Sequence, residues 1–180
     1  MKTLTLLRHA KSSWEDAVPR DFDRPLNKRG RRAAQTIGRE MRRLDLDFDA
    51  VIASPAMRVI ETLDEVAAGY GRDFSARFEQ RVYLAAPETL LELVQDAEDD
   101  ADTLLLVGHN PGLEMLTLSL TETKDNALRR EAAVKYPTAT LAEISLGVER
   151  WADVRMGTGM LMRFIRPRDL DPELGPDEES

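Results

Sequence analysis

Three short, mainly apolar runs along the chain predict buried strands. They cover residues 4–7, 50–53 and 103–107, and each is followed by polar or charged residues. Strands that contact helices on both faces have this continuous apolar pattern. Two later runs, at 138–146 and 159–165, predict further strands.

Between these runs, apolar residues recur at helical spacing and predict four helices, over residues 28–44, 55–68, 87–98 and 113–120. Ser54-Pro55 and Asn110-Pro111 are favourable helix starts, because Ser and Asn cap helices and Pro fits the first turn. Residues 14–31 are charged and contain Pro and Gly, which predicts a loop over the end of the first strand.

Alternating strands and helices predict an α/β fold: a three-layer single domain with a mostly parallel central sheet and helices on both faces. A chain of 180 residues is long enough for one such core. We expect the domain to cover residues 1–166. Residues 167–180 are acidic and rich in Pro and Gly, which predicts a loose tail.

The overall charge narrows the possible partners. The net charge is -8, which argues against nucleic-acid or anionic-membrane binding, since both favour basic surfaces. The chain has no cysteine and therefore no disulfide, thiol nucleophile or cysteine metal site. It also has no signal peptide and no apolar run long enough to span a membrane, so we expect a cytoplasmic protein.

Four basic or titratable residues follow the predicted strands. Arg8 and His9 follow the first strand, Arg58 follows the second, and His109 follows the third. Ligands of open α/β sheets collect at the carboxyl ends of the strands. If the strands are parallel neighbours, these side chains converge there and form a pocket for a tetrahedral anion. An imidazole beside a guanidinium can then act as a nucleophile towards a phosphoryl group.

Other interpretations of the two histidines are weaker. His9 alone could be a stray surface residue after an edge strand. We expect no metal, because catalytic zinc usually needs three protein ligands and two arginines would repel a divalent cation. The chain also lacks the glycine patterns of serine hydrolases, phosphate loops and dinucleotide sites, so no cofactor is expected.

The motifs also carry a family resemblance, and they occur in order along the chain: Leu7-Arg8-His9-Ala10, Ser54-Pro55-x-x-Arg58 followed by Glu61-Thr62, and Gly108-His109-Asn110-Pro111. Together they resemble the histidine phosphatase superfamily. Residues 8–12 and 107–111, and Arg24-Pro25-Leu26 followed by Gly30, resemble its SixA-type phosphohistidine phosphatases. The resemblance extends from residue 4 to about residue 146 and implies a phosphoglycerate-mutase-like fold.

The resemblance implies a role for each matching residue. His9 would be the nucleophile that becomes phosphohistidine, and Arg8, Arg58 and His109 would bind the phosphoryl oxygens. Three adjoining residues are further candidates for phosphate binding: Lys11, Ser12 and Arg24. For Lys11, a solvated surface position is an equally good interpretation.

Two positions depart from the family pattern. Ala10 stands where most members have Gly, a change that the SixA-like members accept. The mutase-like members keep a general-acid Glu at the position of Gln80, which cannot donate a proton in that role. Glu79 and Asp21 are the alternative candidates for the acid.

The resulting expectation is a metal-independent phosphatase that acts through a phosphohistidine intermediate. The preferred substrate is a protein that carries phosphohistidine, with inorganic phosphate as product. A phosphatase for a small phosphoester is the first alternative, and a non-catalytic phosphate-binding module is the second.

Overall fold

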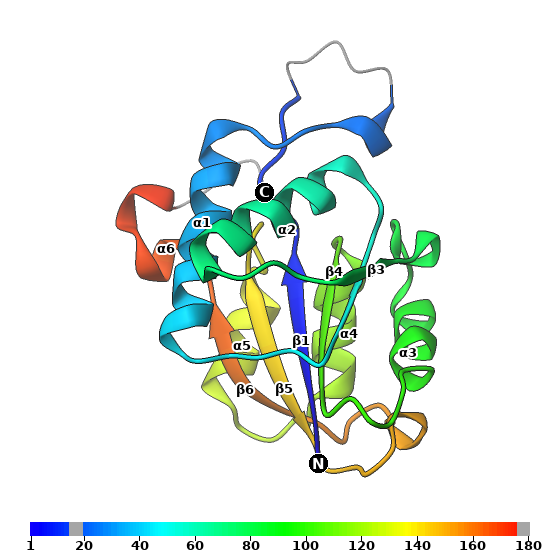
Figure 1. Cartoon of the computed structure of the whole chain (residues 1–180). Coiled ribbons are helices and arrows are strands. Elements are labelled where there is room, and N and C mark those ends of the chain that lie inside the picture. Colours follow the sequence, from blue (N-terminus) through cyan, green and yellow to red (C-terminus); the bar gives the residue numbers. More distant parts are fainter. Residues whose placement is uncertain (15–19, 176–180) are drawn as a thin grey trace.

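The computed structural model describes residues 1–14 and 20–175, and a six-stranded sheet lies at their centre (Figure 1). The strand order is β3-β2-β4-β1-β5-β6, with bounds β1 Lys2–Arg8, β2 Ala50–Ala53, β3 Ala76–Phe78, β4 Thr103–Gly108, β5 Leu141–Leu146 and β6 Met160–Ile165. Only β5 runs antiparallel to the others. The predicted α/β fold with a mostly parallel sheet is confirmed.

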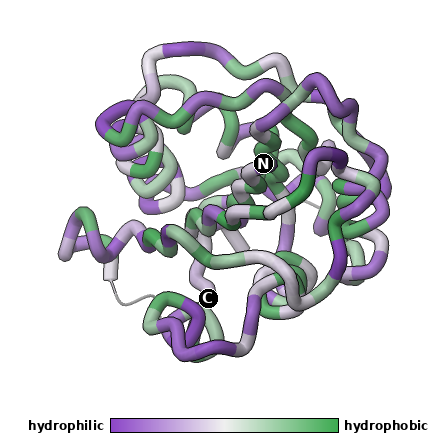
Figure 2. The backbone as a smooth tube through the Cα atoms, turned by 90° about the horizontal axis from the view of Figure 1, so that it is seen from below, coloured by the Kyte–Doolittle hydropathy of each residue, from purple (hydrophilic) through white to green (hydrophobic). Residues whose placement is uncertain are grey.

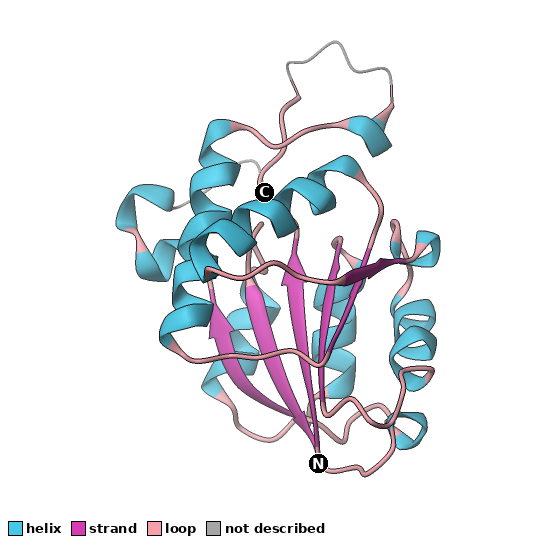
Figure 3. Cartoon of the chain, viewed as in Figure 1, coloured by secondary structure: helices cyan, strands magenta, loops and turns pink. Residues whose placement is uncertain are grey.

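Helices cover both faces of the sheet (Figures 1 and 3). One face packs against α1 (Lys28–Arg43) and α2 (Met57–Tyr70). The other packs against α3 (Pro87–Gln95), α4 (Gly112–Leu120) and α5 (Ala127–Val134). A short α6 (Pro167–Leu170) follows β6, and 3₁₀ turns lie at Asp21–Asp23, Gln80–Val82, Trp151–Asp153 and Pro172–Leu174.

The central strands are apolar because both of their faces are buried. In β1, Leu4 and Leu6 join the core under α3 and α4, whereas Leu7 joins the core under α1 and α2. Leu104 and Leu105 of β4 divide between the two cores in the same way. Figure 2 shows hydrophobic stretches in the interior and hydrophilic ones along the outer helices and loops.

Two predicted helix starts lie further along the chain in the structure. Helix α2 begins at Met57 and α4 at Gly112, although Ser54 still accepts a hydrogen bond from the Ala56 N–H and Asn110 one from the Glu114 N–H. Helix α5 was not predicted, because Ala132 is its only buried residue and it has no broad apolar face. None of the helices in the described part of the chain is long and apolar enough to cross a membrane.

The end of the chain differs from the loose tail expected over residues 167–180. Residues 167–175 form α6 and a 3₁₀ turn, so the expectation is wrong for them. The reason is a buried Leu174 together with ion pairs from Arg32 to Asp171 and Glu173. Residues 176–180 lie outside the described part of the chain, as do residues 15–19 of the predicted loop over residues 14–31.

Candidate active site

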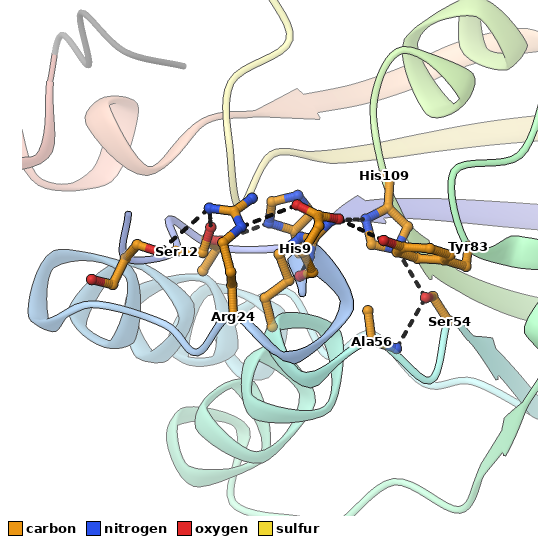
Figure 4. A network of polar contacts seen from close by, with 11 residues as sticks. His9, Ser12, Arg24, Ser54, Ala56, Tyr83 and His109 are labelled. Carbon is orange, nitrogen blue, oxygen red and sulfur yellow. Dashed lines mark hydrogen bonds and ion pairs between the residues drawn. The ribbon is translucent and has the colours of Figure 1, made fainter. Parts of the chain in front are cut away.

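The carboxyl ends of three neighbouring strands, β1, β4 and β2, bring together Arg8, His9, Arg58 and His109. These four side chains line a cavity of about 300 Å³. The other lining residues are Lys11, Ser12, Trp14, Asp21, Arg24, Leu84, Asn110 and Thr138. The ring centroids of His9 and His109 are 5.2 Å apart, and Figure 4 shows both rings within one polar network.

His9 is held in one tautomer by its own backbone. Its Nδ1 lies 2.7 Å from the carbonyl oxygen of Ala10, an acceptor, so Nδ1 carries the proton and donates. The Nε2 lone pair is therefore the one available for attack. Burial, together with the charges of Arg8 and Arg58, lowers the pKa of His9 well below 6.5, which keeps the ring neutral.

The backbone that carries His9 is anchored on α2. The Ala10 N–H donates to Thr62 Oγ1 over 2.9 Å, and the Thr62 hydroxyl donates to the Arg58 carbonyl over 2.6 Å. The preceding residue, Glu61, accepts through Oε1 from the Leu26 N–H at 2.8 Å. The Glu61-Thr62 pair thus joins the loop after β1 to the helix that carries Arg58.

Arg58 is buried and oriented by Asp21. It donates to the Asp21 carbonyl oxygen at 2.8 Å and to Asp21 Oδ2 at 3.0 Å. Its Nε is buried and forms no hydrogen bond within the described residues. The guanidinium is thus held in place at one end by a carboxylate.

His109 is the second imidazole of the cavity. Its Nδ1 lies 3.3 Å from Arg58 Nη2, which can only donate, so Nδ1 accepts and Nε2 donates to Ser54 Oγ at 2.8 Å. Burial and then the charge of Arg58 lower the pKa of His109 to about 3. His109 is therefore neutral while no anion occupies the cavity.

Arg8 and Asn110 donate to the same acceptor. The carbonyl oxygen of Tyr136 accepts from Arg8 Nη1 at 2.8 Å and from Asn110 Nδ2 at 3.0 Å. Both side chains are thereby held at the edge of the sheet, where they line the cavity.

The three further candidates for phosphate binding also line the cavity. Arg24 Nη1 donates to Ser12 Oγ at 2.7 Å, and its Nε donates to Asp21 Oδ1 at 3.1 Å. The Arg24 guanidinium lies 3.5 Å from the ring centroid of Trp14, an exposed residue at the rim. Lys11 follows His9 by two residues and lines the same cavity.

The two candidate acids differ in position. Asp21 lines the cavity; burial raises its pKa, but the Tyr83 hydroxyl and Arg58 lower it more and hold it at about 2. Glu79 is not among the lining residues, and the side chain and N–H of Arg81 lower its pKa. Gln80 is exposed and outside the cavity as well.

Several residues of the site had no assigned role in the sequence interpretation. Tyr83 donates to Asp21 Oδ2 at 2.6 Å and packs edge-on against His109. Thr62 and Ser54 were noted only as parts of motifs, whereas they position Ala10 and His109. Only Ser54, as a polar residue directly after a buried strand, gave a signal that pointed to the site.

Comparison with known proteins agrees with this geometry. The model of the histidine phosphatase superfamily (branch 1) matches residues 4–81. Rv1276c of Mycobacterium tuberculosis is 38% identical over 164 residues, which cover 90% of this chain and all of that protein. ML1117 of Mycobacterium leprae is 31% identical, with the same coverage.

Solved structures show the same relationship. SixA from Nakamurella multipartitia has 28% identity and a TM-score of 0.77, over 92% of this chain and 96% of that chain. SixA from Agrobacterium tumefaciens has 28% identity and a TM-score of 0.75, over 92% and 98%. The chain belongs to the histidine phosphatase superfamily and is of the SixA type. It is a phosphatase that acts on a phosphorylated substrate and releases phosphate.

Proposed function

We propose that this phosphatase removes the phosphoryl group from phosphohistidine on a protein, with His9 as the nucleophile. One observation carries the choice of substrate. Asp21 is the only carboxylate among the described residues that line the cavity, and its pKa of about 2 keeps it ionised. The cavity therefore favours a leaving group that departs without a proton from a carboxylic acid.

The leaving group separates the two substrate classes. An alkyl phosphate expels a strongly basic alkoxide and needs a general acid. A phosphohistidine whose other ring nitrogen carries a proton expels a neutral imidazole and needs none. The two SixA proteins with 28% identity are assigned as phosphohistidine phosphatases, which supports the same choice.

In the first step, the Nε2 lone pair of His9 attacks phosphorus as the bond to the substrate nitrogen breaks. Arg8 and Arg58 bind the phosphoryl oxygens and neutralise their charge. Nδ1 of His9 keeps its proton, and the Ala10 carbonyl stabilises the positive charge that develops on the ring. The imidazole of the substrate leaves with the electron pair of the broken bond.

In the second step, water attacks the phosphorus of phosphorylated His9. The bond between phosphorus and Nε2 breaks, the electron pair returns to His9, and the water protons go to phosphate and solvent. Both steps pass through a transition state with negative charge on the equatorial oxygens. The basic residues of the cavity face this charge in each step.

His109 changes its role when the anion arrives. In the empty cavity burial and Arg58 disfavour its charged form. A phosphoryl dianion beside the ring favours that form, so the pKa of His109 rises on binding. Protonation at Nδ1 ends the hydrogen bond that Nδ1 accepts from Arg58 Nη2, and the new N–H can then donate to a phosphoryl oxygen while Nε2 still donates to Ser54.

The test compares kcat/KM for a phosphohistidine peptide with that for a panel of alkyl phosphates. We expect the peptide to be preferred by orders of magnitude in the wild type. Glu79→Gln leaves this preference unchanged, because Glu79 is outside the cavity. Asp21→Asn lowers both activities, since it loosens Arg58.

The proposal would be contradicted if the wild type hydrolysed alkyl phosphates efficiently and if Glu79→Gln or Asp21→Asn abolished that activity but not the activity on the peptide. Such a result would indicate a small phosphoester as substrate. Phosphate release from a generic aryl phosphate provides the accompanying control. Its absence, with phosphate still bound, would indicate a binding module instead of an enzyme.

A further inference from the structure

A second hollow lies beside the active-site cavity and shares Lys11 and Thr138 with it. Its described lining contains five basic residues and no Asp or Glu: Lys11, Arg29, Lys135, Arg166 and Arg168. The remaining lining residues form a mainly apolar floor: Ala33, Pro137, Thr138, Pro167 and Leu174. We call this feature the basic hollow.

The topology explains why basic side chains gather there. Strand β6 is parallel to β1, because both are antiparallel to β5 between them. Arg166 and Arg168 follow β6, and His9 follows β1. All three residues therefore lie at the end of the sheet where the parallel strands have their carboxyl ends. Arg29 lies in the first turn of α1, and Lys135 follows α5. The basic hollow thus lies at the same end of the sheet as the active site.

The local charge is opposite to that of the whole chain. The net charge is -8, yet every charged side chain that lines the basic hollow is cationic, and all five are partly buried. Arg166 is paired with Asp169 at 2.9 Å and with Glu131 at 3.6 Å. Arg29 and Arg168 form no ion pair with a carboxylate of the described residues. The free space of the hollow is only about 20 Å³, so an anion would contact the cations at its mouth. Partly buried cations of one sign attract an anion there more strongly than scattered surface charges do.

We propose that the basic hollow binds the carboxylate of an acidic side chain close to the phosphohistidine of a protein substrate. This inference rests on the proposed function. With the phosphoryl group at His9, the residues next to the phosphohistidine lie at the mouth of the cavity. Because Lys11 lines both the cavity and the basic hollow, the hollow is next to the mouth of the cavity. An acidic side chain beside the phosphohistidine would therefore lie close to the basic hollow. The hollow thereby selects proteins whose phosphohistidine has acidic neighbours.

The test uses two phosphohistidine peptides that differ only in flanking residues, Asp and Glu in one and Asn and Gln in the other. We expect the wild type to prefer the acidic peptide in kcat/KM, mainly through KM. The double variant Arg29→Gln/Arg168→Gln should lose about three- to tenfold of this preference, in line with two partly exposed ion pairs. Added salt should reduce the preference of the wild type.

Two controls separate this effect from a general loss of charge or of folding. Arg150→Gln/Arg155→Gln removes the same charge at the opposite edge of the sheet, beyond the end of β5, and should keep the preference. The kcat for an aryl phosphate without a second anion should stay within about twofold in the Arg29→Gln/Arg168→Gln variant, because neither residue lines the cavity of His9.

The other outcomes overturn the inference in distinguishable ways. Equal rates on both peptides in the wild type would overturn the basic hollow and leave the proposed function intact. If the enzyme hydrolysed the aryl phosphate but neither phosphohistidine peptide, both the basic hollow and the proposed function would be overturned. If a small bisphosphate were preferred over its monophosphate through Arg29 and Arg168, without any peptide preference, the occupant would be a second phosphate and the proposal would be wrong.

Discussion

His9 offers a substrate only one of its ring nitrogens, because Nδ1 donates to the Ala10 carbonyl oxygen. Hydrogen bonds also orient Arg58 and His109. Asp21 holds Arg58, and Arg58 in turn donates to His109. Asp21, a candidate acid by sequence, is therefore better described as a positioning residue. Each polar group at this scale has its orientation set by a partner.

Arg58→Ala should lower kcat/KM by about a hundred- to a thousandfold, the usual loss of about 2.7–4 kcal/mol for one transition-state donor. Inhibition by vanadate should weaken in parallel, because we propose that the guanidinium binds the tetrahedral anion. Arg77→Ala, at an exposed arginine of β3, is the matched control. Full activity and full inhibition in Arg58→Ala would show that Arg58 contributes nothing to the site.

The two histidines should also make stability depend on pH. Burial lowers the pKa of both, so below about pH 6.5 the unfolded chain binds protons that the folded chain does not; for His109, with a folded pKa of about 3, this holds down to about pH 3. The free energy of unfolding should then fall by about 2 kcal/mol through His109 between about pH 7 and about pH 5, and His9 should add a decrease of the same sign. Urea unfolding checks this, with His109→Asn as comparison.

His109→Asn has one titrating imidazole fewer and should lose about 2 kcal/mol of that decrease. An unchanged slope in this variant would contradict a neutral, buried His109. Carboxylates add to the slope mainly below this range, since their ordinary pKa values are about 4.

At the scale of elements, the loop after β1 is positioned by helices. Its residues contact α2 through Thr62 and α1 through Gly30, where a Cβ would lie 2.1 Å from the Lys11 carbonyl oxygen. The sequence showed the Gly after Arg24-Pro25-Leu26 as a motif. It could not show the reason, which is a close approach between segments that are distant in the chain.

Gly30→Ala should therefore displace the loop that carries His9. We expect a loss of about 1–3 kcal/mol in stability, typical of overpacking, and a larger fractional loss of activity. Gly147→Ala is the control, because a Cβ there meets nothing within 4 Å. Thermal unfolding and aryl-phosphate turnover measure both effects. Equal behaviour of the two variants would contradict the close approach.

The first, second and fourth strands and the main helices were predictable because each has a strong apolar pattern of its own. Elements defined by contacts were not predictable in this way. Tyr83 reaches the site only because the turn after β3 folds back onto His109. The polar partners of Arg58, which are Asp21 and His109, likewise come from segments far along the chain, which no local pattern encodes.

At the scale of the whole molecule, the C-terminal segment completes the core under α1. Leu174 is 7% exposed and belongs to that core, although the acidic composition around it predicted a loose tail. A single buried leucine and ion pairs to Arg32 outweigh the composition of the segment. The same segment closes one side of the basic hollow.

Leu174→Ala should reduce the free energy of unfolding by about 2–5 kcal/mol, as for other buried leucines. Glu173→Gln, which removes only an exposed ion pair, should cost about 0–1 kcal/mol. Chemical denaturation measures both. Similar small effects from the two substitutions would contradict the packing of this segment against the domain.

The measurement that tests the central claim most directly is rapid quenching of the enzyme during turnover of a labelled phosphohistidine peptide. The account predicts a transient phosphoenzyme that is labile to acid and stable to alkali, with the label on His9. His9→Ala should show neither the label nor turnover. Wild-type turnover by His9→Ala, or a label on any other residue, would contradict covalent transfer to His9.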